Sequence, residues 1–308
     1  MTGTMKRAAL CAAVVAIAGC SASAGPGATE AIAADGGDLG QAWLALHAAM
    51  KAGDAAKATP LLDGRQWNLA NKQPSWFQMF AEGDPGRPMG GRRNGDRATL
   101  FLDESTPGDE TGRDYRHVNA TRVGSGWVFD NPTTLGSSFS THEARDCVAL
   151  PTVFPCGVET APAGKVAGTI VPKPKPDEPE RHVLLDGFAA RMVPSEGGEP
   201  TATRVVLSTL GINPAALALS SDPDHVYGWL GWPVMKLDIA PDGSSATLEY
   251  YGGRGRAKQA LTKELVLEPA TPGRIKGRLA LDHAEAGKID VSFDLSTASI
   301  CRADEYPC

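Results

Sequence analysis

Four arginines form the only basic cluster of this 308-residue chain: Arg87, Arg92, Arg93 and Arg97. A guanidinium group binds a carboxylate or a phosphate through two parallel hydrogen bonds, so the cluster predicts a site for an acidic partner or a phosphate. The surrounding segment, Glu82 to Arg97, is rich in glycine and proline and predicts an exposed loop. A solvated loop without a ligand is the default interpretation of such a segment. The motif G-x-x-x-x-G-K does not occur, which argues against a nucleotide-type phosphate loop.

A second candidate binding site combines aromatic side chains with glycines: Tyr227, Trp229 and Trp232. Exposed aromatic rings stack on sugars or dominate the energy of a protein interface, whereas packing in the core or between domains is the alternative. The preceding turn, Asp222-Pro223-Asp224-His225, offers oxygen atoms to a cation. One short acidic turn is not a complete ligand set, so neither a metal nor a cofactor is predicted.

Recognisable catalytic motifs are missing from the sequence. It contains no nucleophile elbow, zincin motif, phosphate loop or EF-hand loop. Asp114 and His117 lie three residues apart on a predicted strand, where they face opposite sides of a sheet and make a poor catalytic pair. No catalytic residue is therefore predicted.

The N-terminus has the order of a secretion signal. Lys6 and Arg7 precede an apolar run from Ala8 to Ala18, and Gly19-Cys20 follows. The run is too short for a membrane-spanning helix, which needs about 20 residues. The segment resembles the signal peptide of bacterial lipoproteins, in which the cysteine is acylated and becomes the first residue of the mature protein.

That resemblance implies that residues 1–19 are removed, that Cys20 carries the lipid, and that the protein is held in the cell envelope. Ser21 after the cysteine favours the outer membrane, with the protein facing the periplasm. Residues 20–37 are rich in alanine, glycine and serine and predict a flexible tether. Ordinary secretion, with cleavage near Ala22 or Ala24, is the alternative.

Once Cys11 leaves with the signal and Cys20 takes the lipid, the chain retains four cysteines: Cys147, Cys156, Cys301 and Cys308. An even number outside the cytoplasm predicts two disulfides. Three connectivities satisfy the count. We favour Cys147–Cys156 and Cys301–Cys308, because each joins cysteines that are close in sequence and neither ties two domains together.

The remaining chain is mildly acidic and long enough for two domains. The formal charge changes from −6 to −8 when Lys6 and Arg7 leave with the signal, so no nucleic-acid partner is predicted. We place the two domains at residues 38–163 and 164–308.

The first domain begins with a helical pattern and continues with strands. Apolar residues recur at helical spacing before Gly53: Leu39, Trp43, Leu46 and Met50. Further helices are predicted at Asp54–Leu62 and Pro74–Phe80, and strands at Tyr115–Val123 and Gly126–Phe129. This order predicts an α+β domain with helices on one face of an antiparallel sheet.

The helical pair between Trp43 and Leu62, together with the segment Gly126–Asp130, resembles the NTF2-like domains of secreted bacterial proteins. The resemblance implies N-terminal helices packed on a curved antiparallel sheet, with room for a pocket between them. In an enzymatic version of that fold His117 would point into the pocket.

Strand patterns dominate the second domain. Apolar residues alternate at Met235–Ile239, Ile275–Leu281 and Ile289–Leu295, with turn residues between them, which predicts an all-β antiparallel sandwich or barrel. Gly273–Leu279 and Ile289–Asp294 resemble a C-terminal β-domain of uncharacterised proteobacterial envelope proteins. That resemblance implies a fold and a compartment but no activity.

The anchor, the tether, the disulfides and the missing motifs together predict a non-catalytic envelope lipoprotein that binds a partner protein or a ligand. One form of this prediction is an inhibitor or immunity protein that neutralises an incoming toxin or a cell-wall hydrolase. The alternative is an enzyme or a small-molecule-binding protein that uses a pocket in the NTF2-like domain.

Overall fold

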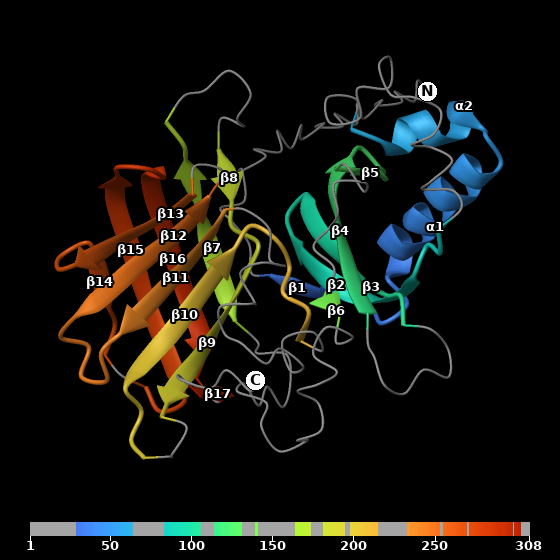
Figure 1. Ribbon diagram of the computed structural model, residues 1–308. Helices are drawn as coiled ribbons and strands as arrows, with labels where there is room; N and C mark the ends of the chain where they lie inside the picture. The colour runs from blue at the N-terminus through green and yellow to red at the C-terminus, as the bar shows by residue number, and fades with distance from the viewer. Residues whose placement is uncertain are drawn as a thin grey trace, which may run out of the picture.

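Three β-sheets, here called A, B and C, make up most of the protein (Figure 1). The computed structural model describes residues 29–63, 83–105, 114–130, 139–140, 164–173, 181–194, 198–214, 233–252, 255–269, 271–297 and 299–302.

Sheet A is antiparallel, with strand order β1-β2-β3-β4-β5 and with β6 paired to β4. Its strands are β1 (Glu30–Ile32), β2 (Arg87–Asn94), β3 (Arg97–Asp103), β4 (Asp114–Val123), β5 (Gly126–Phe129) and β6 (Phe139–Ser140). Three helical segments accompany it: α1 (Gly37–Lys51), α2 (Ala55–Ala58) and the 3-10 turn η1 (Thr59–Leu61). Figure 1 shows α1 on the side of sheet A that faces away from sheets B and C.

Helix α1 presents the predicted apolar stripe to sheet A. Trp43 is fully buried, and its ring meets Phe129 of β5 edge-on with the ring centroids 5.4 Å apart. Leu100 of β3 lies in the same cluster. The helix ends at Lys51, and Gly53 follows with a left-handed φ of 66° that turns the chain away. The sequence prediction for this helix is confirmed.

The predicted fold class of the first domain, an α+β NTF2-like domain, is wrong, because the described chain is mostly β. Among the described residues, α1 is the one helix longer than a single turn. Helix α2 has four residues, and Pro60 follows within a 3-10 turn of three. The helix predicted at Pro74–Phe80 lies outside the described residues.

The loop predicted at Glu82–Arg97 is also wrong, because half of it is strand β2. A Cβ atom on Gly91 would lie 2.3 Å from the carbonyl oxygen of Thr99, so only glycine lets β2 approach β3 this closely. The register shifts between Pro88 and Gly91, which marks a bulge. Glycine and proline, which are loop signals in a sequence, here belong to a bulged strand.

Sheets B and C form a β-sandwich. Sheet B contains, in spatial order, β13 (Gly255–Leu261), β12 (Ala246–Gly252), β11 (Val234–Ile239), β10 (Ala202–Ser208), β9 (Asp186–Val193) and β17 (Ser299–Arg302). Sheet C contains β14 (Leu265–Leu267), β15 (Arg274–His283), β16 (Gly287–Ser296), β7 (Lys165–Val171) and β8 (His182–Val183). Paired strands are antiparallel except β17, which runs parallel to β9.

Alternate residues of the two sheets turn inward and form one core. Ala189, Val205 and Leu237 are cross-strand neighbours on sheet B, and they are buried with Val291 and Phe293 of sheet C. The alternating segments predicted in this half of the chain are confirmed as β11, β15 and β16. The sequence prediction omits β10, β13 and β17.

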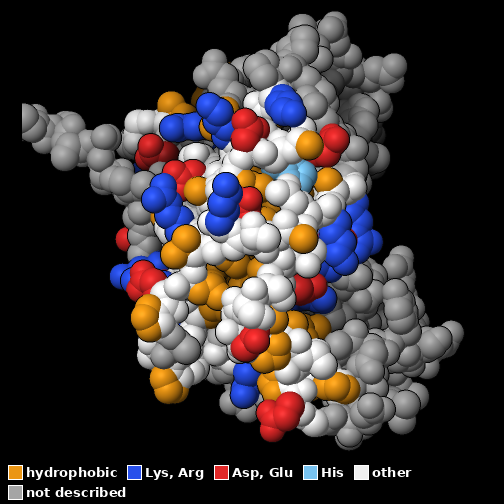
Figure 2. Space-filling view, turned by 90° about the vertical axis from the view of Figure 1, so that its left-hand side faces the viewer, with side chains coloured by type: hydrophobic (Ala, Val, Ile, Leu, Met, Phe, Trp, Pro, Cys, Tyr) orange, Lys and Arg blue, Asp and Glu red, His pale blue; other side chains and the backbone are white. Residues whose placement is uncertain are grey.

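Charged side chains of both signs cover the outside of the sandwich. Arg278 of β15 forms an ion pair with Asp290 of β16 at 2.9 Å, and both side chains are exposed. Figure 2 shows positive and negative side chains interspersed over one face, with hydrophobic side chains gathered between them. A mixed surface of this kind attracts neither strongly acidic nor strongly basic partners over its whole area.

Residues 29–37, which the sequence predicts as the end of the tether, contact two halves of the molecule: sheet A with its helices, and the β-sandwich. Strand β1 pairs with β2, and the hydroxyl of Thr29 donates a hydrogen bond to the carbonyl oxygen of Leu185. Residues 29–37 are therefore part of the folded structure. Among the helices that the structure describes, none combines the length and the hydropathy of a membrane span.

Candidate functional site

Arg92, one of the predicted binding arginines, lies at the junction between sheets A and B. Its Nε donates to Oδ2 of Asp186 on β9 at 3.1 Å, and the two side chains are 12% and 10% exposed. The same oxygen accepts the backbone N–H of Ile212 at 3.0 Å. Burial raises the pKa of Asp186, and the charge of Arg92 opposes that rise. Arg92 thus joins the two halves of the molecule.

The other three arginines of the cluster each have a carboxylate partner within the chain: Arg87–Asp103 at 2.7 Å, Arg93–Glu30 at 2.5 Å and Arg97–Asp130 at 2.9 Å. A carboxylate or phosphate from outside would compete with these internal partners. The binding role of Arg87, Arg92 and Arg93 stays a prediction.

Other predicted residues lie outside the described part of the chain. They are the lipidated Cys20, the turn Asp222–His225, the aromatic residues Tyr227, Trp229 and Trp232, and the cysteines Cys147, Cys156 and Cys308. Cys301 is placed by its backbone on β17, next to Met192 of β9. Lipidation, disulfide pairing and the aromatic binding surface therefore stay predictions.

His117 of β4 is buried on the face of sheet A that lies opposite α1. Its neighbour Val118 belongs to the core beneath α1, and the β3–β4 register is regular, so His117 points to the other side. Burial lowers the pKa of His117 to about 4, which makes the imidazole neutral near pH 7. His117 does not face the helical side, where the NTF2-like resemblance implied a pocket.

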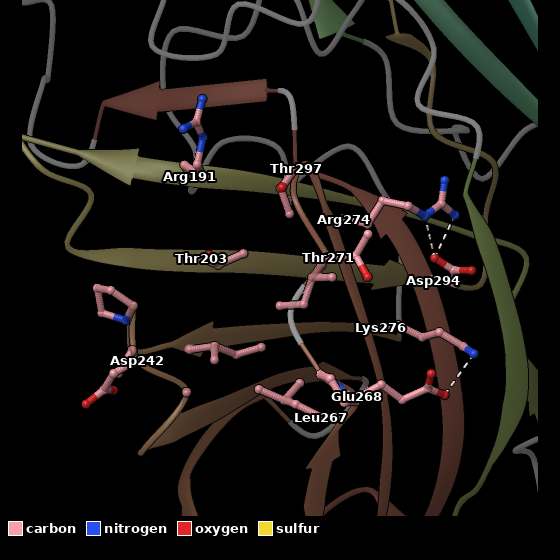
Figure 3. A pocket seen from close by; sticks show the side chains of 16 residues that line it. Arg191, Thr203, Asp242, Leu267, Glu268, Thr271, Arg274, Lys276, Asp294 and Thr297 are labelled. Atoms are coloured by element: carbon pink, nitrogen blue, oxygen red, sulfur yellow. Dashed lines mark hydrogen bonds and ion pairs between the residues drawn. The ribbon is translucent and has the colours of Figure 1, made fainter.

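A pocket opens at one end of the sandwich, between the ends of sheets B and C (Figure 3). Its volume is about 580 Å³, and small-molecule sites typically have roughly 300–1,000 Å³. On sheet B one row of cross-strand neighbours lines it, formed by Arg191 of β9, Thr203 of β10 and Ile239 of β11. Leu267 and Ile275 line it from sheet C.

Most charged side chains of the pocket are held by neighbours. The contacts are Lys276–Glu268 at 2.8 Å, Arg274–Asp294 at 2.6 Å, and the hydroxyl of Ser244 on Asp242 at 2.7 Å. The hydrogen bonds from Ser244 lower the pKa of Asp242, and the hydrogen bond to Glu268 raises the pKa of Lys276, so both stay charged near pH 7. Figure 3 shows the two ion pairs on the opposite side of the pocket from Arg191.

No protein-family model, no curated protein and no solved structure matches this chain. Within the described ranges, no group of three or more His, Cys, Asp or Glu side chains could hold a metal ion.

Sequence patterns do not single out this pocket. Arg191 lies on β9, where residues of both faces are buried, so the alternation that would reveal its inward direction is hidden. Thr203 lies on β10, which the prediction omits. The position of Arg191 becomes visible only when the pairing of β9, β10 and β11 is known.

Proposed function

We propose that the protein is a lipid-anchored envelope protein that binds a small molecule in the pocket at the end of its β-sandwich. The observation that carries this proposal is the pocket itself, with about 580 Å³ of space at the end of a well-packed core. The lipoprotein-like signal around Cys20 supports the anchor and the envelope location.

The side chains of the pocket favour binding over covalent catalysis. Among the described residues that line it there is no histidine, cysteine or serine, the side chains that most often serve as general base or nucleophile. The acidic side chains of the lining are engaged by Arg274, Lys276 and Ser244. Threonine hydroxyls, aliphatic side chains and Arg191 also line the pocket, and such groups orient and hold a ligand.

A bound molecule should be detectable directly. The wild-type protein, recovered from the membrane fraction of its own cells and transferred to detergent, should carry a small molecule in native mass spectrometry. Thr203→Trp should lose it, because the indole fills the pocket from the middle of the lining row. Ala280→Trp places the same bulk on an exposed position of β15 and should keep the molecule.

Two results would contradict the proposal. One is a wild-type protein without any bound small molecule. The other is a molecule that Thr203→Trp retains as well as Ala280→Trp does, because that molecule would lie elsewhere.

A further inference from the structure

Arg191 occupies a position where the fold otherwise places core residues. On sheet B, Arg191 faces the same side as Ala189, two residues earlier on β9. Ala189 and its cross-strand neighbours Val205 and Leu237 are fully buried. Arg191 is exposed because the pocket begins at its row. The strand geometry thus directs a permanent positive charge into the mouth of the cavity.

The described chain does not neutralise this charge. Neither an ion pair nor a side-chain hydrogen bond joins Arg191 to a described residue, and the acidic side chains of the lining are already engaged by other groups. Asp294 pairs with Arg274, Glu268 pairs with Lys276, and Asp242 accepts from its own turn. An anion that enters the pocket would therefore meet no described carboxylate that already pairs with Arg191.

Three hydroxyl groups line the same pocket: Thr203, Thr271 and Thr297. Within the described residues none of their side chains takes part in a hydrogen bond. Hydroxyl groups donate readily to carboxylate and phosphate oxygens. Figure 3 shows Thr203, Thr297 and Arg191 on the same side of the pocket, across from the two ion pairs.

Aliphatic side chains line the pocket beside its ion pairs. Ile239 comes from sheet B, and Leu267 and Ile275 come from sheet C. The volume of about 580 Å³ lies within the range of small-molecule sites. The space thus exceeds what a bare phosphate or carboxylate needs, and aliphatic walls favour an apolar body beside the charged group.

We propose that the ligand is a small amphiphilic anion, whose carboxylate or phosphate pairs with Arg191 and whose apolar body lies against Ile239, Leu267 and Ile275. This inference rests on the proposed function, since it names the chemistry of the molecule that the same pocket holds.

Calorimetric titration with three probes tests the inference: octanoate, 1-octanol and inorganic phosphate. The mature chain with Cys20→Ser is used, so that neither its own acyl chains nor detergent compete for the pocket. Octanoate should bind, and Arg191→Gln should weaken it at least about tenfold, because a charge-assisted hydrogen bond is lost. Arg191→Lys should keep most of the affinity. Lys258→Gln removes an exposed positive charge on β13 and should change nothing.

Each component of the inference has its own contradicting result. If octanoate binds Arg191→Gln as tightly as wild type, or binds neither, the anionic group is wrong. If 1-octanol matches octanoate on the wild-type protein, the charge contributes nothing. If inorganic phosphate binds as tightly as octanoate, the apolar body is wrong. The pocket itself fails only when native mass spectrometry finds no molecule that Thr203→Trp displaces, so the two proposals are distinguished.

Discussion

At the scale of the residue, His117 shows how burial alone sets the charge of a side chain. Only 3% of His117 is exposed, and burial lowers its pKa from 6.5 to about 4. Between these two values an unfolded chain takes up a proton on this imidazole and the folded chain does not. The contribution of the neutral imidazole to the free energy of unfolding is therefore fully present above pH 6.5, and it is lost as the pH falls towards 4.

The lowering of the His117 pKa from 6.5 to about 4 corresponds to about 3 kcal/mol. Urea unfolding at pH 7 and at pH 4 should show the wild-type protein losing about 3 kcal/mol more stability than His117→Gln, whose side chain does not titrate. Carboxylates titrate in both proteins, so the comparison isolates the imidazole. Parallel losses in the two proteins would mean that His117 is charged in the folded state.

The arginines show why single residues are hard to place from sequence. Arg92 and Arg93 are adjacent in the chain, yet Arg92 is buried with Asp186, 94 residues away, and Arg93 pairs with Glu30 near the surface. Arg191 has no basic neighbour in the sequence and yet enters the pocket. The partner of a charged side chain depends on tertiary contacts, which local composition does not contain.

At the scale of the element, strands were predictable where one face is buried and the other is solvated. Strand β15 alternates from Arg274 to His283 between exposed and buried residues, and its prediction is confirmed. Strand β9 is buried on both faces, and edge strand β13 carries Arg256 and Lys258, so neither shows clean alternation. Strand β2 was misjudged because its glycines serve close packing, not a turn.

The packing of β2 on β3 leads to a prediction about Gly91. Gly91→Ala would place a methyl group 2.3 Å from a backbone oxygen of Thr99. Overpacking of this kind should lower the free energy of unfolding by about 1–3 kcal/mol, as measured by urea denaturation. Gly126→Ala is the matched control, since its nearest neighbour would be 3.9 Å away, and it should stay within about 0.5 kcal/mol of wild type. Equal effects would show that β2 and β3 are not this close.

At the scale of the whole molecule, two separate apolar cores are joined by a junction that contains buried polar contacts. One core lies between α1 and sheet A, and the other lies inside the sandwich. Between them, the backbone N–H of Gly211 donates to Thr99 at 2.8 Å, and the side chain of Asn94 donates to the carbonyl oxygen of Val166 at 3.4 Å. The buried Arg92–Asp186 pair lies in the same junction. Cooperation between the two halves should therefore depend on these polar contacts.

The last prediction follows from that junction. Arg92→Gln leaves the buried carboxylate of Asp186 without its cation. This variant should lower the free energy of unfolding by about 3 kcal/mol, because an uncompensated buried charge destabilises the fold more than the loss of both charges does. Arg87→Gln is the same change on the same strand, but Arg87 is 79% exposed, so it should cost at most about 1 kcal/mol. Calorimetry should show one unfolding transition for the wild type and for Arg87→Gln, and two for Arg92→Gln.

The double variant Arg92→Gln with Asp186→Asn measures how strongly the two charges are coupled in the free energy of unfolding. Because it removes both charges, it should recover part of the stability that Arg92→Gln loses. The junction would have to be held by other contacts if Arg92→Gln behaved like Arg87→Gln. It would likewise be held elsewhere if the effects of Arg92→Gln and Asp186→Asn were simply additive, because coupled charges that share one buried contact do not add.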